Sequence, residues 1–215
     1  MITIKTFVFN PFQVNTYVLY DETKNCIIID PACMDEHENN QLTEFIEKHN
    51  LQPVKLYNTH THLDHIAGNR FVAEKYNINL EIHSEALDIM RSVKISAERF
   101  GLNIVESIEP SAFINDGDVI KFGNSQLKVL YTPGHAAGSV CFYSKNDNFV
   151  ISGDVLFNQS IGRSDLPTGN HKILIDSIAA KLMVLPLDTV VCTGHGTSTT
   201  IGFEKANNQF LRKIV

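Results

Sequence analysis

A short stretch of the sequence concentrates side chains that bind transition metals. Residues 60–65 read His-Thr-His-Leu-Asp-His, so three of the nine histidines and one aspartate fall within six positions. Neutral imidazole and carboxylate are ligands that suit zinc, and imidazole also binds iron, copper and nickel. This stretch, which we call the histidine cluster, therefore predicts a metal site.

A zinc ion that only stabilises the fold is the alternative interpretation of the histidine cluster. Structural zinc sites are rich in cysteine and are closed at four ligands. The cluster contains no cysteine and offers four ligands before the rest of the chain is considered. The residue types therefore favour a site that keeps a position for reacting molecules.

The spacing of the cluster favours an extended conformation. On a helix one metal could not reach all four ligands, because His60 and Asp64 would face away from the other two histidines. In an extended segment His60, His62 and Asp64 lie on one side, and the chain turns at His65. We expect the cluster to be a loop at the carboxyl end of a strand at 53–57, where α/β proteins place their chemistry.

The same pattern, an apolar strand followed by small residues and then one histidine or aspartate, occurs three more times. His135 follows a predicted strand at 126–131, Asp154 follows one at 149–152, and His195 follows one at 189–192. If these strands lie side by side in sheets, their ends converge, and the neighbouring glycines permit tight turns.

The convergence gives seven candidate ligands, which are more than one tetrahedral zinc ion can use, even with a position left for water. They are His60, His62, Asp64, His65, His135, Asp154 and His195. Two metals that share a carboxylate account for all seven. The other four histidines, His37, His49, His83 and His171, lack this setting, and we expect them on the surface or at a pocket rim.

The remaining elements follow from periodicity. Further strands are predicted at 2–9, 15–20, 26–29, 80–83, 119–122 and 140–144. Helices are predicted at 35–49, 68–76, after Ser84, at 170–185 and from Thr200 toward 210. The stretch 92–111 lacks clean periodicity, and we interpret it as an irregular excursion that covers a pocket. A long loop is expected at 156–169.

Composition limits the classes of function. The 215 residues carry a formal net charge of −6 without a basic run, which argues against nucleic-acid and membrane partners. The four cysteines form no C-x-x-C pair, so a reducing compartment with free thiols is expected, with one disulfide as the alternative. The N-terminus lacks an apolar signal core, and no apolar run approaches the roughly 18 residues of a membrane span. We expect a soluble, cytoplasmic chain with a single domain at 1–215.

Together these residues resemble the metallo-β-lactamase superfamily, whose mark is H-x-H-x-D-H followed by a histidine, an aspartate and a final histidine. The resemblance extends from residues 15–17 to the G-H-G at 194–196. It implies an α/β fold, the αβ/βα four-layer sandwich of two mixed β-sheets flanked by helices. It also implies that His60, His62 and His135 hold one metal, that Asp64, His65 and His195 hold a second, and that Asp154 bridges them.

Within that superfamily, residues 153–157 and 160–167 look most like the short glyoxalase II group, the hydroxyacylglutathione hydrolases. This likeness implies a thioesterase that cleaves a small S-acyl thiol with a metal-bridging hydroxide, positioned by Asp64 and Asp154. Two divalent ions are implied, zinc first, with iron or manganese as alternatives.

The sequence also departs from that group at several positions. No C-terminal helical domain of the kind that holds glutathione follows His195, and Gly196-Thr197 stands where a tyrosine is usual. Arg163 replaces a lysine and Asp165 an aromatic residue. The Arg163 guanidinium either binds a substrate carboxylate or pairs with Asp165.

Other functions fit the same ligands. Persulfide dioxygenases share the fold and a similar G-R-[ST]-D stretch, and their single iron could be held by His60, His135 and Asp154. A different hydrolase of the superfamily, such as a lactonase, is a further alternative. A non-enzymatic metal protein is disfavoured, because seven ligands leave room for exchangeable water.

Overall fold

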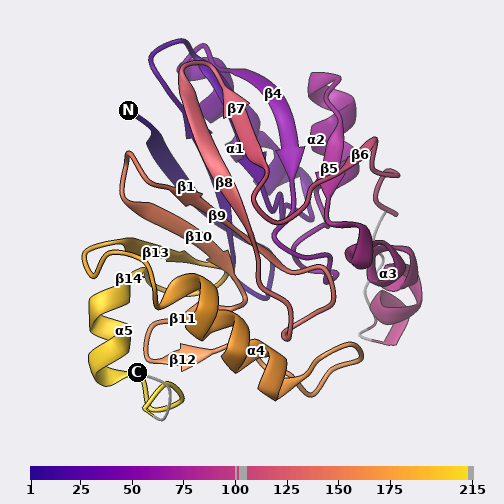
Figure 1. Cartoon of the computed structure of the whole chain (residues 1–215). Coiled ribbons are helices and arrows are strands. Elements are labelled where there is room, and N and C mark those ends of the chain that lie inside the picture. Colours follow the sequence, from indigo (N-terminus) through magenta and orange to yellow (C-terminus); the bar gives the residue numbers. More distant parts are fainter. Residues whose placement is uncertain (100, 102–105, 213–215) are drawn as a thin grey trace.

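The computed structural model describes residues 1–99, 101 and 106–212, and most of its strands lie in two six-stranded mixed sheets (Figure 1). The first sheet has the order β1-β2-β3-β4-β5-β6, antiparallel up to β3 and parallel beyond it. Its strands are β1 Thr3–Phe9, β2 Val14–Tyr20, β3 Asn25–Ile29, β4 Gln52–Tyr57, β5 Leu80–Ile82 and β6 Ala112–Phe113.

The second sheet has the order β14-β13-β10-β9-β8-β7, and in it the β10–β13 pair is parallel while the other pairs are antiparallel. Its strands are β7 Val119–Phe122, β8 Ser125–Tyr131, β9 Val140–Ser144, β10 Phe149–Gly153, β13 Val190–Thr193 and β14 Thr199–Thr200. A separate small hairpin joins β11 Leu156–Phe157 to β12 Ser160–Ile161.

Helices cover the outer face of each sheet (Figure 1). They are α1 Glu36–Lys48, α2 Asn69–Tyr76, α3 Leu87–Arg99, α4 His171–Ser177 and α5 Ile201–Asn207. Leu42 of α1 and Val72 of α2 belong to a buried cluster with the first sheet, whereas Leu174 of α4 and Ile201 of α5 belong to one with the second. A third apolar cluster lies between the sheets. The predicted αβ/βα four-layer sandwich is therefore confirmed.

Strand β3 shows why two layers of core require nearly continuous apolar runs. Cys26 and Ile28 pack toward the helices, while Ile27 and Ile29 pack toward the second sheet, and all four are fully buried. Successive side chains of a strand point to opposite faces, so a strand covered on both faces has no polar side. All four cysteines of the chain are buried and unpaired, as expected for free thiols.

The irregular region predicted at 92–111 is partly wrong. Residues 92–99 continue helix α3, whose inward face is made by Met90, Val93 and Ala97, at 6%, 4% and 2% exposure. Within residues 92–99 the apolar residues are Val93, Ile95 and Ala97, and their spacing of two does not show a helical period. Residues 100 and 102–105, on which the proposed pocket cover also fell, lie outside the described residues.

Two other predictions need correction. The helix predicted at 170–185 is α4 followed by a π-helical turn, Ile178–Leu182, although its stripe of Leu174, Ile178 and Leu182 is fully buried as expected. The loop predicted at 156–169 contains the β11–β12 hairpin, whose two-residue strands are too short to show a period. Within the described residues, no helix is long and apolar enough to cross a membrane.

The buried carboxylate of Asp21 ties the two sheets together at one end. This side chain is 3% exposed and accepts hydrogen bonds from the Thr23 backbone N–H at 3.0 Å and from the Asn124 backbone N–H at 2.7 Å. The Ser125 hydroxyl donates a further hydrogen bond at 2.8 Å. Burial alone would raise the pKa of Asp21, but these hydrogen bonds lower it below its usual value.

Replacement of Asp21 is expected to weaken the fold in a pH-dependent manner. Because the pKa of Asp21 is lower in the folded chain, its contribution is complete above the unfolded pKa of about 4 and is lost as the pH falls through the folded value. Asp21→Asn should therefore lower the free energy of unfolding by about 1–3 kcal/mol at pH 7 and by less near pH 3. Urea unfolding measures both values, with the exposed Asp188→Asn as control. An equal loss at both pH values would contradict this account.

Candidate metal centre

Four strand ends bring all seven predicted ligands to one place at the seam between the two sheets. Residues 60–65 follow β4 of the first sheet, while His135, Asp154 and His195 follow β8, β10 and β13 of the second. Three overlapping groups of donor atoms form there, each with its atoms within 4.8 Å of one another. They are His60, His62 and His135; His60, His65 and Asp154; and Asp64, His65 and His195.

The first group consists of the three imidazoles of His60, His62 and His135, whose donor atoms lie close together. His135 Nε2 lies 3.3 Å from His60 Nε2 and 3.0 Å from His62 Nδ1. The His60 and His135 rings meet edge to face, with their centroids 4.7 Å apart. His60 and His135 are buried, whereas His62 is half-buried.

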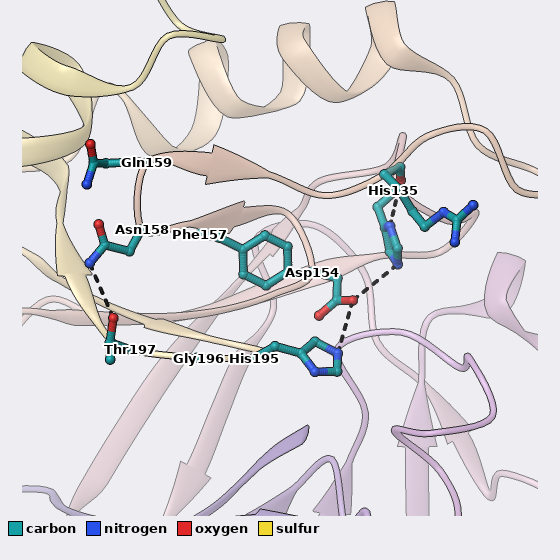
Figure 2. A pocket seen from close by; sticks show the side chains of 9 residues that line it. His135, Asp154, Phe157, Asn158, Gln159, His195, Gly196 and Thr197 are labelled. Carbon is teal, nitrogen blue, oxygen red and sulfur yellow. Dashed lines mark hydrogen bonds and ion pairs between the residues drawn. The ribbon is translucent and has the colours of Figure 1, made fainter. Parts of the chain in front are cut away.

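The group of Asp64, His65 and His195 combines imidazole and carboxylate, and we call it the second group, with the three histidines as the first. His65 Nε2 lies 3.3 Å from His195 Nε2, and Asp64 Oδ2 lies 3.5 Å from His195 Nε2. Asp154 contacts both groups, since its Oδ2 atom is 3.6 Å from His135 Nε2 and 3.5 Å from His195 Nε2. Figure 2 shows the Asp154 carboxylate between these two imidazoles. The donor atoms thus form two groups with the Asp154 carboxylate close to both.

The outer ring nitrogens of four histidines are fixed by acceptors. His135 Nδ1 donates to the Arg163 carbonyl at 2.7 Å, and His195 Nδ1 donates to the Phe12 carbonyl at 2.9 Å. His65 Nδ1 lies 3.0 Å from Asp30 Oδ2, and His60 Nδ1 lies 3.1 Å from the Thr59 hydroxyl oxygen. An N–H on the outer nitrogen leaves the Nε2 lone pair directed at the centre, as in metal-binding histidines.

The donor set fits metal ions better than it fits hydrogen bonds between its members. The ring nitrogens of the neutral imidazoles of His60, His62 and His135 face one another at 3.0–3.3 Å, so their lone pairs repel, and a cation between them removes that repulsion. The Oδ1 atom of Asp154 is buried and makes no hydrogen bond among the described residues. Buried carboxylate oxygens of this kind are paired with charges or coordinate metals.

Electrostatics separate the two groups. Burial and the neighbouring imidazole of His135 lower the pKa of His62 to about 4, and burial with nearby histidines lowers the pKa of His60 well below its usual value. Burial opposes protonation of His195 as well, but hydrogen bonds to Asp154 and Asp64 raise its pKa to about 10. The pKa of Asp154 lies well below its usual value because the cationic form of His65 outweighs the cost of burial. The three-histidine group is thus neutral and the other group is rich in carboxylate.

Asp30 is a site residue that the sequence prediction missed. Its carboxylate is 1% exposed and accepts hydrogen bonds from the Thr59 N–H at 2.7 Å, the Thr59 hydroxyl at 2.7 Å and His65 Nδ1 at 3.0 Å. It therefore holds both the start of the histidine cluster and the ring of one donor. Asp30 directly follows strand β3 without the small residues that precede the other candidate ligands, so the strand-end pattern did not select it.

Glycines beside the donors permit a close approach of the backbone. A Cβ atom on Gly194 would overlap Asp154 Oδ1, and one on Gly162 would overlap the Asp154 carbonyl oxygen. The expected role of glycine next to the ligands is therefore visible at these two positions.

A cavity of about 620 Å³ opens beside the donor atoms. Its lining residues are His135, Asp154, Phe157, Asn158, Gln159, Arg163, His195, Gly196 and Thr197. The Arg163 guanidinium donates two hydrogen bonds of 2.8 Å to the Asp165 carboxylate, so the ion pair considered from the sequence is present, although Arg163 also faces the cavity. The remaining four histidines belong to none of the donor groups found among the described residues.

The chain belongs to the metallo-β-lactamase superfamily, whose family model matches residues 9–195. It is 36% identical to the probable metallo-hydrolase YqgX of Bacillus subtilis (strain 168), over 94% of this chain and 93% of that protein. It is 35% identical to the hydroxyacylglutathione hydrolase GloC of Haemophilus influenzae, over 93% of each chain. Among solved structures, TTHA1623 in a di-iron-bound form superposes with a TM-score of 0.86 at 32% identity, covering 96% of this chain and 100% of that one. The fold and these relatives define a metal-dependent hydrolase.

Loss of the Asp30 carboxylate should weaken metal binding without removing any ligand. Asp30→Asn keeps the size of the side chain, but it removes the charge that faces His65. It also replaces one of the two carboxylate oxygens that accept hydrogen bonds from the Thr59 N–H and hydroxyl. Losses at such supporting residues are typically about 10–100-fold in metal affinity. Titration of the metal-free protein with zinc against a competing chelator measures the change. An affinity equal to that of the unaltered chain would show that Asp30 does not orient the ligands.

Proposed function

We propose that this chain is a binuclear metal-dependent hydrolase that cleaves S-acyl thiols, similar to glyoxalase II. The observation that carries the proposal is the position of Asp154, which lies within 3.6 Å of histidines from both donor groups. One carboxylate shared by two ligand groups is an arrangement that suits two neighbouring metals. The likeness to a hydroxyacylglutathione hydrolase supports thioesters as the substrate class.

In this proposal His60, His62 and His135 would hold one cation, and Asp64, His65 and His195 would hold the other. Asp154, which lies close to both groups, would serve the two cations together. When bound, two divalent cations supply a nucleophilic hydroxide near neutral pH and a Lewis acid for the substrate carbonyl. Zinc is the first candidate for both positions because imidazole and carboxylate suit it, with iron or manganese as alternatives.

The carboxylates of Asp64 and Asp154 orient the attacking water. They are the only anionic members of the donor set, and one oxygen of each lies 3.5 Å from His195 Nε2. A carboxylate oxygen accepts a hydrogen bond from a water O–H, which would fix the orientation of that water beside the donor atoms. Arg163, which lines the same cavity, is the proposed substrate-binding residue, through its guanidinium N–H groups.

The reaction needs no nucleophile from the protein. The water oxygen forms a bond to the thioester carbonyl carbon, the C–S bond breaks with its electron pair going to sulfur, and a water proton ends on the thiolate. A thiol pKa near 8.5 makes this leaving group acceptable without a strong general acid. The cysteines do not compete for the role, because burial raises the pKa of Cys26, Cys33 and Cys141 to about 12 and that of Cys192 to about 11.

Metal analysis is the decisive test of this function. Purified protein should contain about two zinc ions per chain, and their removal by a chelator should abolish thioester hydrolysis until zinc is restored. Elemental analysis and a thiol-release assay measure the two quantities. One iron per chain, together with oxygen consumption on a persulfide, would overturn the hydrolase in favour of a dioxygenase.

A single ligand variant tests the assignment of the first group. His62→Ala should lose the metal of that group and lower kcat/KM by more than about 100-fold. The loss of a direct ligand should have a larger effect than the loss of a residue that only supports a ligand. Metal content and thioester hydrolysis are measured together. His37→Ala, at an exposed position of helix α1, is the control. Full metal content in His62→Ala would refute the role of His62 as a ligand.

A further inference from the structure

One wall of the cavity consists of uncharged polar groups around an aromatic ring. It is formed by residues 157–159 at the turn of the β11–β12 hairpin together with Thr197, and we call it the hairpin wall. Figure 2 shows the Phe157 ring between the Asn158–Thr197 pair and the Asp154–His195 pair. The Phe157 and His195 ring centroids are 6.2 Å apart, so this ring adjoins the donor atoms.

The C-terminal segment holds the turn of the β11–β12 hairpin at three consecutive residues, 158–160. The Asn158 side-chain amide donates to the Thr197 hydroxyl at 3.3 Å, and the Gln159 backbone N–H donates to Glu204 Oε2 at 3.0 Å. The Ser160 carbonyl accepts from Asn208 Nδ2 at 3.0 Å. Three attachments in a row fix a turn whose two-residue strands would not be rigid alone.

Glu204 is the centre of this attachment. Its side chain is 0% exposed, yet its carboxylate has only neutral donors among its hydrogen-bond partners in the described chain. Thr199 donates at 2.6 Å and Asn208 at 2.7 Å, in addition to the Gln159 N–H. A carboxylate that is removed from water is stable only when its oxygens accept several hydrogen bonds. Because one of these donors is the Gln159 N–H, the position of the turn is strongly specified.

The positive charge available to a substrate in this cavity is small. Arg163 is the only cationic side chain among the described lining residues apart from the donor histidines, and Asp165 neutralises it through two hydrogen bonds. The hairpin wall adds no charge, and the chain as a whole is acidic. A thiol portion with several carboxylates, such as glutathione, therefore finds no unbalanced cation outside the metal ligands.

We propose that the hairpin wall binds the thiol portion of the substrate, and that this portion is uncharged and contains amide groups. The Asn158 and Gln159 amides and the Thr197 hydroxyl both donate and accept hydrogen bonds, as an amide does, and Phe157 covers an apolar segment. The inference rests on the proposed thioesterase function and names the substrate class of the same site. Arg163 then contributes N–H groups to a carbonyl of the substrate, and its charge is secondary.

Two thioesters with the same acyl group test the inference. S-acetyl-N-acetylcysteamine is uncharged and carries one amide, whereas S-acetylglutathione carries two carboxylates and an ammonium group. The zinc-loaded protein should hydrolyse the uncharged thioester with a kcat/KM at least about tenfold higher. An equal or higher value for S-acetylglutathione would overturn the inference alone. Hydrolysis of neither thioester would overturn the proposed function itself.

The Arg163–Asp165 pair provides a matched test of the charge argument. Asp165→Asn should raise kcat/KM for S-acetylglutathione by about two- to fivefold, the range of an exposed ion pair, and leave the uncharged thioester unaffected. The gain should disappear in Asp165→Asn combined with Arg163→Gln. Asp176→Asn, which breaks the exposed pair with Lys172 outside the cavity, is the control. A gain of equal size for both thioesters would contradict selection by charge.

The wall itself is tested by Asn158→Leu, which keeps the size of an exposed side chain and removes its amide. KM for S-acetyl-N-acetylcysteamine should rise about fivefold with kcat unchanged, because the contact lies away from the reacting carbonyl. Glu204→Ala should raise KM in the same way, whereas Glu204→Gln, which can still accept from Gln159 and Asn208, should restore it. An unchanged KM in both Asn158→Leu and Glu204→Ala would rule out the hairpin wall as the binding surface.

Discussion

The buried carboxylate of Asp30 is the interaction on which the rest of the centre depends. Strands β3 and β4 are parallel and pair Ile29 with Tyr57, so their ends place Asp30 beside Thr59. No lysine or arginine contacts this carboxylate among the described residues. The Thr59 N–H and hydroxyl and the His65 ring stabilise it instead. The same contacts fix the position of the loop that carries the candidate ligands. A left-handed backbone at Asp30, with φ of 50°, turns the carboxylate toward that loop.

The two halves of the donor set come from different sheets, so the seam between the sheets must be held accurately. Direct hydrogen bonds across the seam do this beside the ligands. The Val140 N–H donates to the Thr59 carbonyl at 2.8 Å, and the Tyr17 hydroxyl donates to the Thr193 carbonyl at 2.6 Å. The Asn15 N–H donates to the Gly194 carbonyl at 2.7 Å. The residue adjoining His60 and the residue adjoining His195 are thus each fixed to the opposite sheet, which is how a site shared by two layers acquires defined distances.

The family resemblance carried by the histidine and aspartate motifs was sufficient to predict the layered fold. The seven candidate donors could be selected from the residues beside the strand ends, and the structure brings their side chains together. The role of Asp30 could not be predicted, because its sequence neighbours indicate only a strand that ends at Pro31. The role becomes visible once strands β3 and β4 are paired. The hairpin wall could not be predicted for a related reason. Its strands have two residues each, and its position depends on Glu204, which lies 45 residues away in the chain. Local periodicity carries no information about such distant attachments.

This division of the molecule separates the chemistry from the choice of substrate. The donors follow strands whose carboxyl-terminal residues are largely buried, so their positions depend on the core. The hairpin wall lies outside both sheets and is attached chiefly to the last helix, α5, through Glu204 and Asn208. Replacing an exposed side chain such as Asn158 alters the surface that meets the substrate without a change in packing around the donors. A chain with this architecture can keep the hydrolytic centre while the wall adapts to a different thiol.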